Sequence, residues 1–394
     1  MVLCILGRQP ALGRAELERL YGASALTPLN DTVVMMDVPL AKILARPLGG
    51  TMKIAEVITT VPSRDWRNVG QKFVGFFTQY APHHGKLTIG LSTYGFNVSA
   101  RDIQKTGIII KQRLKSRDGS TRVLPQEENA LSTAQVFHNK LGTTENKKEI
   151  IFAASTDGQT VIAETKHVQD IDAYAFRDRS RPRRDAFVGM LPPKLAQVMI
   201  NLGAGPLGTD TRLLDPFCGT GVVLQEAALF GWSVYGTDLN EKMIRYSRDN
   251  LNWLTTTHRI QFEWHLHQAD ARTAQWQKPI DTVVCEAYLG QPFSAVPAQE
   301  KLEEARYECN NIIKGFLKNI APQLAPDTPL CIAVPAWHLE NDVVHLPVLD
   351  DLLEIGYNRI DFTHALQSDL IYHREDQIVG RELLVLTRSR DVKS

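Results

Sequence analysis

The chain has 394 residues, and its 44 lysine and arginine residues are balanced by 44 aspartate and glutamate residues. The balance is uneven, because residues 1–194 hold 27 basic and 18 acidic side chains whereas residues 195–394 hold 17 and 26. These counts exclude a uniformly acidic or basic protein and indicate two parts with different electrostatic partners, while 43% hydrophobic and 22% charged residues are typical of a globular chain.

The chain carries no apolar run of roughly 18 residues, so we expect no membrane span. Residues 1–16 lack a basic leader and contain Arg8 and Arg14, which predicts a buried strand and turn instead of a signal peptide. The five cysteines are scattered and form no C-x-x-C pair. That pattern favours a reducing cytoplasm and predicts neither a disulfide framework nor a metal site.

Short apolar strands alternate with helix-like segments over residues 1–60. We expect strands at Val2–Leu6 and Thr32–Asp37, and helices at Gly13–Tyr21 and Leu40–Leu48. This patterning predicts a small α+β domain.

Residues 61–165 continue in the same style and predict a second α+β domain. Lys86–Thr93 alternates as a strand, Ser99–Arg117 has the period of a helix with Ser99 as its N-cap, and a hairpin is expected around Asp157-Gly158. Arg101–Arg122 holds seven basic and two acidic residues. Its Lys111, Arg113 and Lys115 are candidate RNA contacts, although a soluble helix surface would also account for them.

Residues 166–190 are predicted to be an arginine-rich linker. The candidate RNA-binding residues in it are Arg177, Arg179, Arg181, Arg183 and Arg184. Arginine neutralises phosphate charge, which favours RNA contact. The alternative is a solvated linker whose arginines pair with Asp178 and Asp185.

From residue 211 the pattern changes to regular strand–helix alternation. Such alternation predicts a mostly parallel, doubly wound α/β sheet with helices on both faces. The last strands, Leu370–Tyr372 and Gly380–Leu386, have no helix between them, so we expect an antiparallel hairpin to close the sheet.

The most informative segment is Leu213–Gly221, an apolar strand that ends at Asp215 and runs into a glycine loop and a helix. Gly219 and Gly221 permit positive φ and a close approach of the backbone to a ligand. An alternative is a tight strand-to-helix turn without a ligand. The absence of a G-K-[ST] sequence excludes a P-loop.

Two further acids follow the next two predicted strands. Asp238 ends the second strand, where an acid is suited to ribose hydroxyls. Asp270 follows the third strand and is suited to accept from an adenine amino group. Each alone is typical of a surface strand end, but together behind a glycine loop they indicate a nucleoside-like ligand.

Asp215–Gly221 resembles motif I of the class I S-adenosylmethionine-dependent methyltransferases, in the form used by RNA and DNA amino-methyltransferases. Arg181–Asp185 and Gly189–Ala196 resemble the segment that joins a THUMP domain to the catalytic domain in tRNA guanine-N2-methyltransferases of the position-10 guanosine type. Leu131–Gln135 and Glu149–Ala154 fit the ferredoxin-like and THUMP half, and the ending at Ile371-Tyr372 and Gly380–Leu386 is also similar.

This resemblance implies a Rossmann-like domain over residues 191–394 with a seven-stranded mixed sheet, preceded by ferredoxin-like (1–60) and THUMP-like (61–165) domains. It implies S-adenosylmethionine as cofactor and tRNA as partner, not DNA, and leaves room for a small activator subunit. The residues expected to bind the cofactor are Asp215, Phe217, Gly219, Gly221, Asp238, Leu239, Asp270 and Ala271.

The chain departs from the family where the fourth strand ends. The family carries Asp-Pro-Pro-Tyr there, and this chain reads Glu286-Ala287-Tyr288-Leu289. Glu286 keeps a carboxylate that can accept from the target amine, and Tyr288 can stack on the base, so both are the predicted catalytic residues. The missing prolines remove a fixed φ, which leaves an altered target or lost activity as the alternative.

The sequence thus predicts a cytoplasmic enzyme that methylates the N2 amine of a guanosine in tRNA. Two alternatives stay open. One is a non-catalytic RNA-binding protein with this fold, and the other is a methyltransferase that acts on a different amine.

Overall fold

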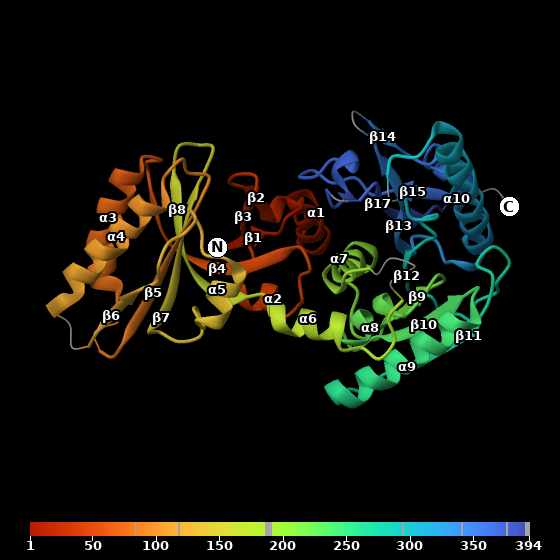
Figure 1. Cartoon of the computed structure of the whole chain (residues 1–394), viewed down its shortest axis with the longest axis horizontal. Helices are drawn as coiled ribbons and strands as arrows, with labels where there is room; N and C mark the ends of the chain where they lie inside the picture. Colours follow the sequence, from red (N-terminus) through yellow and green to blue (C-terminus); the bar gives the residue numbers. More distant parts are fainter. Residues whose placement is uncertain are drawn as a thin grey trace. The chain divides into compact units, whose positions relative to one another are not determined.

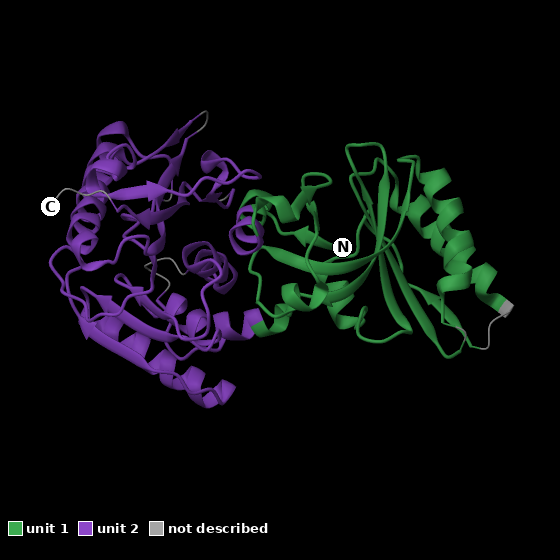
Figure 2. Ribbon diagram, turned by 180° about the vertical axis from the view of Figure 1, so that it is seen from behind, with its two compact units in different colours: residues 1–14, 22–173 green, residues 15–21, 174–394 purple. Residues whose placement is uncertain are grey.

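The computed structural model describes residues 1–82, 84–116, 119–185, 191–293, 295–339, 342–375 and 377–390. Figure 1 shows its helices and strands, and Figure 2 shows its two compact units. The first unit comprises residues 1–14 and 22–173, and the second comprises residues 15–21 and 174–394. Each unit has its own β-sheet. Among the described residues, no helix is long and apolar enough to cross a membrane.

The first unit is built on one eight-stranded sheet with the order β2-β3-β1-β4-β8-β7-β5-β6. Most neighbours are antiparallel, but β5 runs parallel to both β6 and β7. The strands are β1 (Val2–Leu6), β2 (Leu26–Pro28), β3 (Val33–Met36), β4 (Thr51–Val61), β5 (Leu87–Tyr94), β6 (Thr121–Val123), β7 (Lys147–Ala154) and β8 (Thr160–Val168).

Helices α3 (Trp66–Tyr80) and α4 (Ala100–Arg113) lie side by side on this sheet (Figure 1). Their apolar faces bury Phe73, Phe77 and Ile110 against strand residues such as Phe152, which makes the larger core of the unit. Ser99 caps α4 by accepting from the backbone N–H of Asp102, as its sequence predicts. The remaining α-helices that begin in this unit are α1 (Pro10–Tyr21), α2 (Leu40–Leu44), α5 (Thr133–His138) and α6 (Ile171–Arg179).

The predicted division of this region at residues 60 and 61 is wrong as a structural boundary. It falls inside β4, which pairs with β1 on one side and with β8 on the other. A buried ion pair crosses the predicted division, since the Lys53 ammonium lies 2.5 Å from a Glu149 carboxylate oxygen and both side chains are at most 1% exposed. The sheet is continuous because β4 supplies hydrogen bonds on both edges. Whether its two ends correspond to ferredoxin-like and THUMP domains stays a prediction.

The second unit contains a nine-stranded mixed sheet whose continuous path has seven strands, in the order β11-β10-β9-β12-β13-β17-β15. The first five strands of this path, from β11 through β10, β9 and β12 to β13, run parallel to one another. Strand β17 is antiparallel to β13 and to β15. These strands are β9 (Arg212–Asp215), β10 (Ser233–Asp238), β11 (Trp264–Gln268), β12 (Thr282–Glu286), β13 (Pro329–His338), β15 (Tyr357–Arg359) and β17 (Val379–Arg388). The short β14 (Val343–Val344) and β16 (Ile371–Tyr372) pair with β13 and β17.

Helices cover both faces of this sheet, as expected from the alternating sequence. On one face Ile313 and Phe316 pack in a core with Val283 and Cys285 of β12. On the other face a Cβ on Gly203 would lie 2.7 Å from Val284, so a glycine is needed for this close approach. The helices are α7 (Pro193–Ala204), α8 (Val222–Ala228), α9 (Glu241–His258), α10 (Gln299–Ile320) and α11 (Leu352–Ile355).

The order of the parallel strands reverses at β9. The chain proceeds from β9 outward to β10 and β11, and then returns to place β12 on the other side of β9. Parallel sheets bind ligands in the crevice beyond the carboxyl ends of the strands at such a reversal. The fold therefore places a site where β9, β10 and β12 end.

The predicted linker 166–190 is partly wrong, because most of it is regular structure. Residues up to Val168 belong to β8, and Ile171–Arg179 form α6. Residues 186–190, including Gly189 and Met190, lie outside the described residues. Asp170 accepts from the backbone N–H of Ala173, which supports the start of α6.

Candidate active site

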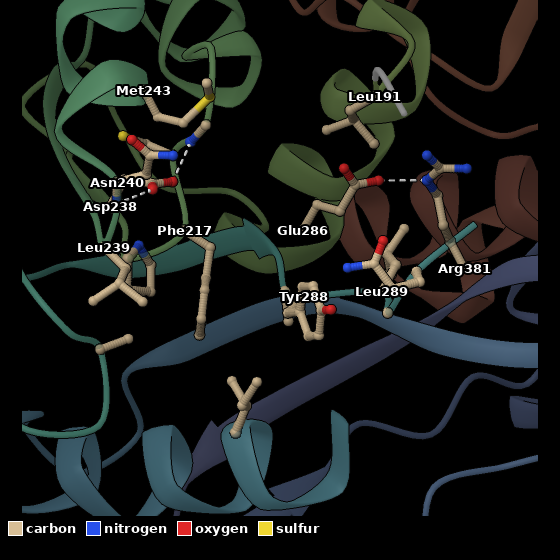
Figure 3. A pocket seen from close by; sticks show the side chains of 18 of the residues that line it. Leu191, Phe217, Asp238, Leu239, Asn240, Met243, Glu286, Tyr288, Leu289 and Arg381 are labelled. Atoms are coloured by element: carbon tan, nitrogen blue, oxygen red, sulfur yellow. Dashed lines mark hydrogen bonds and ion pairs between the residues drawn. The ribbon is translucent and has the colours of Figure 1, made fainter. Parts of the chain in front are cut away.

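A cavity of about 1240 Å³ lies beyond the carboxyl ends of β9, β10 and β12. It exceeds the common range of small-molecule sites, roughly 300–1,000 Å³. Figure 3 shows Asp238 and Asn240 on one side of it and Glu286 with Arg381 on the other, with Phe217 and Tyr288 between them. Of the predicted cofactor-binding and catalytic residues, the cavity is lined by Asp215, Phe217, Gly219, Asp238, Leu239, Asp270, Ala271, Glu286 and Tyr288.

The glycine loop is fixed by the residues around it. Gly219 has φ of 51°, and the nearest atom to a Cβ built there is 4.0 Å away, so packing alone does not require a glycine. Ser247 donates its hydroxyl to the Gly219 carbonyl at 2.9 Å, and Asn250 donates to the Thr220 carbonyl at 2.8 Å. Both donors belong to α9, which therefore holds the loop open beside the cavity.

Gly221 has a different place from the predicted one. It is not among the residues that line the described cavity, and it forms the N-cap of α8 with φ of 80°. A Cβ at this position would lie 2.8 Å from the Ser247 hydroxyl oxygen. The structure thus explains this glycine by backbone conformation and close packing.

Asp238 ends β10 and organises the loop. Its carboxylate accepts from the backbone N–H of Gly219 at 2.9 Å and from that of Asn240 at 2.8 Å. Burial raises its pKa above the ordinary value, and these two hydrogen bonds oppose the rise. Each oxygen retains acceptor capacity, so the side chain can also receive the hydroxyl groups of a sugar.

Asp215 is almost completely buried at the end of β9. Burial raises the pKa of its carboxyl well above the ordinary value, the N–H of Phe217 opposes this, and the charges of Asp238 and Glu286 reinforce it. The Asp215 carboxylate accepts the Phe217 N–H at 3.1 Å, which shapes the start of the loop. A carboxyl kept in such a place is typical of functional sites.

Asp270 lies on the cavity wall in a pair with its neighbour. The Arg272 guanidinium donates to both carboxylate oxygens, at 3.1 and 2.7 Å, and holds the pKa of Asp270 below its ordinary value. Its predicted role as an acceptor for an adenine amine stays a prediction. Leu239 supplies a large apolar surface beside it, since it is 64% exposed.

Glu286 ends β12 and forms an ion pair with Arg381 of β17. The side chains are only 17% and 8% exposed. Burial raises the pKa of Glu286, and the Arg381 guanidinium opposes that rise. Tyr288 lies two residues further along the same wall, and burial and the charge of Glu308 raise its pKa. The two predicted catalytic residues therefore share one cavity with the strand-end acids.

The sequence interpretation missed several cavity residues. Arg381 lies on β17, which also carries Glu382 and Arg388, so its local sequence does not single it out. Leu191 and Met243 add apolar walls (Figure 3). Nothing in their local sequence distinguishes them from core residues.

The predicted RNA contacts in the arginine-rich segment divide into two groups. For Arg177 and Arg181 the prediction is wrong, because their side chains are 10% and 1% exposed and cannot reach phosphates. Arg177 donates to both oxygens of the buried Glu226, at 2.7 and 3.1 Å, and Arg181 pairs with Asp178. These arginines hold the second unit together.

The other predicted contacts are exposed and stay predictions. Arg183 pairs with Asp249 at 2.6 Å and lies over the ring of Tyr246, so its charge is partly engaged. Exposed side chains in both units make up this group: Arg179, Arg183, Arg184, Lys111, Arg113 and Lys115.

Comparison with known proteins agrees with this geometry. The family model "UPF0020: RMKL-like, methyltransferase domain" matches residues 180–314. A tRNA (guanine(10)-N2)-dimethyltransferase of Methanothermobacter thermautotrophicus is 33% identical over 162 residues, which are 41% of this chain and 44% of that protein. The chain thus matches less than half the length of this relative. A Methanothermococcus thermolithotrophicus protein named "Probable tRNA (guanine(10)-N2)-dimethyltransferase" is 30% identical over 129 residues, 32% of this chain and 76% of the relative.

Solved structures share the fold. TrmN from Thermus thermophilus aligns with 98% of this chain and 100% of its own, with a TM-score of 0.53 and 14% identity. SMU.472, crystallised with SAH, aligns with 100% of this chain and 98% of its own, with a TM-score of 0.50 and 14% identity.

The sheet order and the strand-end cavity define a class I S-adenosylmethionine-dependent methyltransferase domain. This confirms the predicted fold class of residues 191–394. The chain belongs to the family of the tRNA (guanine(10)-N2)-dimethyltransferases. The predicted family is therefore also confirmed.

Proposed function

We propose that this protein uses S-adenosylmethionine to methylate the exocyclic N2 amine of a guanosine in tRNA. One observation carries the proposal. A single cavity joins the strand-end acids of a cofactor site, Asp215 and Asp238, to Glu286 and Tyr288 on the opposite wall. A methyl donor and a target amine could meet there without crossing solvent, and family membership supports the choice of substrate.

The residues present fit the cofactor. The Gly219 backbone leaves room beside the cavity, Asp238 offers acceptors for ribose hydroxyls, and Leu239 with Met243 offers apolar surface for a flat ring. When bound, S-adenosylmethionine supplies an electrophilic methyl group on a positively charged sulfur. The described lining of the cavity has seven acidic and three basic side chains, and this balance favours a cation.

The chain's own contribution at the target is to orient an amine. The lone pair of an aromatic amine is delocalised into the ring, so the amine attacks better when an acceptor holds its N–H groups. Glu286 provides the carboxylate, and Tyr288 provides an aromatic face for the base. In this proposal, positioning of the two reactants supplies most of the rate increase.

The proposed partner is tRNA, bound by the exposed basic side chains of both units. The phosphate backbone dominates such binding, and the acidic surface after residue 281 is poorly suited to it. We place the enzyme in the cytoplasm, because its five cysteines are buried and none is placed in a disulfide, as is typical of reducing compartments. DNA is not proposed as a substrate.

The test is methylation of an unmodified tRNA transcript with radiolabelled S-adenosylmethionine, followed by digestion to nucleosides. Label in N2-methylguanosine or N2,N2-dimethylguanosine supports the proposal, and turnover by the chain alone would show that no activator subunit is required. A transcript with adenosine in place of the guanosine at position 10 is the matched control. Label in another nucleoside would indicate a different amine. Cofactor binding without any label would indicate an RNA-binding protein that has lost catalysis.

A further inference from the structure

Glu286 and Arg381 meet across an intervening strand. Glu286 on β12 pairs in register with Ala333 of β13, and Arg381 on β17 pairs with Pro335. Side chains two residues apart on a strand point to the same face, so all four lie on one face of the sheet. Ala333 carries only a methyl group, and the long arginine side chain reaches Glu286 from the other side of β13.

The pair is made through one atom on each side. The Arg381 Nε–H donates to Oε1 of Glu286. Within the described part of the chain, the structure gives no other hydrogen bond to Oε2 of Glu286 or to the two Nη groups of Arg381. Both side chains line the cavity, and Figure 3 shows them turned toward each other at its wall. A free acceptor thus lies beside free donors.

The charges around Glu286 explain why the pair matters. Burial, reinforced by the charge of Glu286, raises the pKa of the Asp215 carboxyl on β9 and that of the Cys285 thiol next to Glu286. Burial favours a protonated Glu286, while the Arg381 guanidinium is the described cation that opposes this effect. A protonated carboxyl would lose much of its acceptor strength toward an amine.

We propose that Arg381 is a positioning residue that holds Glu286 ionised and fixes one of its oxygens, so that the other oxygen faces the target amine. This rests on the proposed function, because it assigns a role to a second residue of the same site. The Glu286–Arg381 pair also compensates for the absence of the family's two prolines. Where a fixed φ aims the acceptor in relatives with Asp-Pro-Pro-Tyr, the side-chain pair aims it here.

Three substitutions separate charge from geometry. Arg381→Gln and Arg381→Met remove the charge, and Arg381→Lys keeps the charge but loses the planar guanidinium. Arg359→Gln is the matched control. Its side chain is partly buried on the neighbouring β15 and lies 3.7 Å from Glu382, away from the cavity residues.

The first measurement does not depend on turnover. In protein labelled with ¹³C at the glutamate carboxyl carbons, Glu286→Gln identifies the Glu286 resonance. We expect Arg381→Gln and Arg381→Met to raise its pKa by at least about one unit. Arg381→Lys should move it much less, and Arg359→Gln should leave it unchanged. If the pKa of Glu286 is the same in wild type and in Arg381→Gln, the proposal is overturned, even if the enzyme has no activity.

The second measurement is the pH dependence of kcat with tRNA. We expect Arg381→Gln to lower kcat at neutral pH by at least about tenfold, with little change in KM for the cofactor, and to shift the acidic limb to higher pH. Arg381→Lys should return the acidic limb to its wild-type pH but should restore only part of kcat. An unshifted limb in a folded Arg381→Gln variant would contradict the role. If the wild-type protein transfers no labelled methyl group to tRNA, the proposed function is contradicted instead. The carboxyl titration still decides the role of Arg381.

Discussion

Asp238 accepts the backbone N–H of Gly219 over 2.9 Å, and this contact ties the end of β10 to the glycine loop after β9. The carboxylate therefore has two tasks, which are to shape the loop and to offer acceptors to a ligand. Asp238→Ala removes both. We expect its dissociation constant for S-adenosylhomocysteine to rise by roughly 10- to 100-fold in isothermal titration calorimetry, the cost of a lost charged hydrogen bond.

Glu241→Ala is the control for that change, because Glu241 lies three residues away on α9 and pairs with Arg245 on the surface. Its affinity should match wild type. RNA binding should be preserved in both variants, and an unchanged cofactor affinity in Asp238→Ala would remove Asp238 from the site.

Gly221 and Gly231 share a positive φ, of 80° and 81°, but differ in surroundings. Nothing lies within 4 Å of a Cβ on Gly231, whereas a Cβ on Gly221 would meet Ser247. Gly231→Ala should lower the free energy of unfolding by about 1–2 kcal/mol from backbone strain alone. Gly221→Ala should lower the free energy of unfolding by more than Gly231→Ala does, because the loop must also move. Equal midpoints in urea denaturation would disprove the contribution of the Ser247 contact.

Arg177 and Arg179 are two residues apart and should behave in opposite ways. Arg177→Ala leaves the buried Glu226 carboxylate without its bidentate partner, so we expect a loss of about 3–5 kcal/mol in the free energy of unfolding. Arg179 is exposed, and Arg179→Ala should leave stability near wild type while weakening tRNA binding. Denaturation and filter binding measure the two effects. Strong destabilisation by Arg179→Ala would be inconsistent with the structure.

Asp215 predicts a pH dependence of stability. Its folded pKa is raised above the unfolded value, so the native state holds a proton that the unfolded state has lost as pH rises through that window. The free energy of unfolding should therefore fall as pH rises there. Asp215→Asn should flatten this dependence and raise stability at the alkaline end, although cofactor affinity falls. Glu354→Gln on α11 is the surface control, and a profile that keeps its wild-type slope in Asp215→Asn would contradict the assignment.

The basic end of α4 predicts a salt dependence of tRNA binding. Lys111 and Arg113 are exposed, and Lys115 follows them in a 3₁₀ turn. If all three contact phosphates, replacing them with alanine should reduce the slope of log affinity against log salt by roughly 2–3. Lys301 is an exposed lysine on α10 in the acidic half, and Lys301→Ala should leave the slope unchanged. An unaltered slope in the triple variant would leave α4 as soluble surface.

Local patterns were sufficient to predict the glycine loop, the strand-end acids and the position of Glu286. A strand, a glycine loop and a helix follow one another within Leu213–Ala228, so their geometry is encoded in neighbouring residues. The strand-end acids Asp215, Asp238 and Asp270 then line one cavity, because parallel strands end at one edge of the sheet.

Long-range pairing could not be predicted in this way. Arg381 is 95 residues from Glu286, and Arg177 is 49 residues from Glu226. A count of charges in a segment does not show which arginine meets a buried carboxylate, so the sequence wrongly predicts Arg177 as an RNA contact. The division at residue 60 failed for a similar reason, since the pairing of β4 on both edges is a property of the whole sheet.

The second unit is not continuous in sequence. Residues 15–21 of α1 belong to it, where Glu16 accepts from the Asn201 side chain at 2.7 Å and Glu18 accepts the backbone N–H groups of Thr363 and His364 at 2.6 and 2.9 Å. A gene fragment that begins at Tyr174 would lack both carboxylates. Chimeras that exchange catalytic halves between relatives must therefore carry this short helical segment along, although it is encoded more than 150 residues upstream of the remainder.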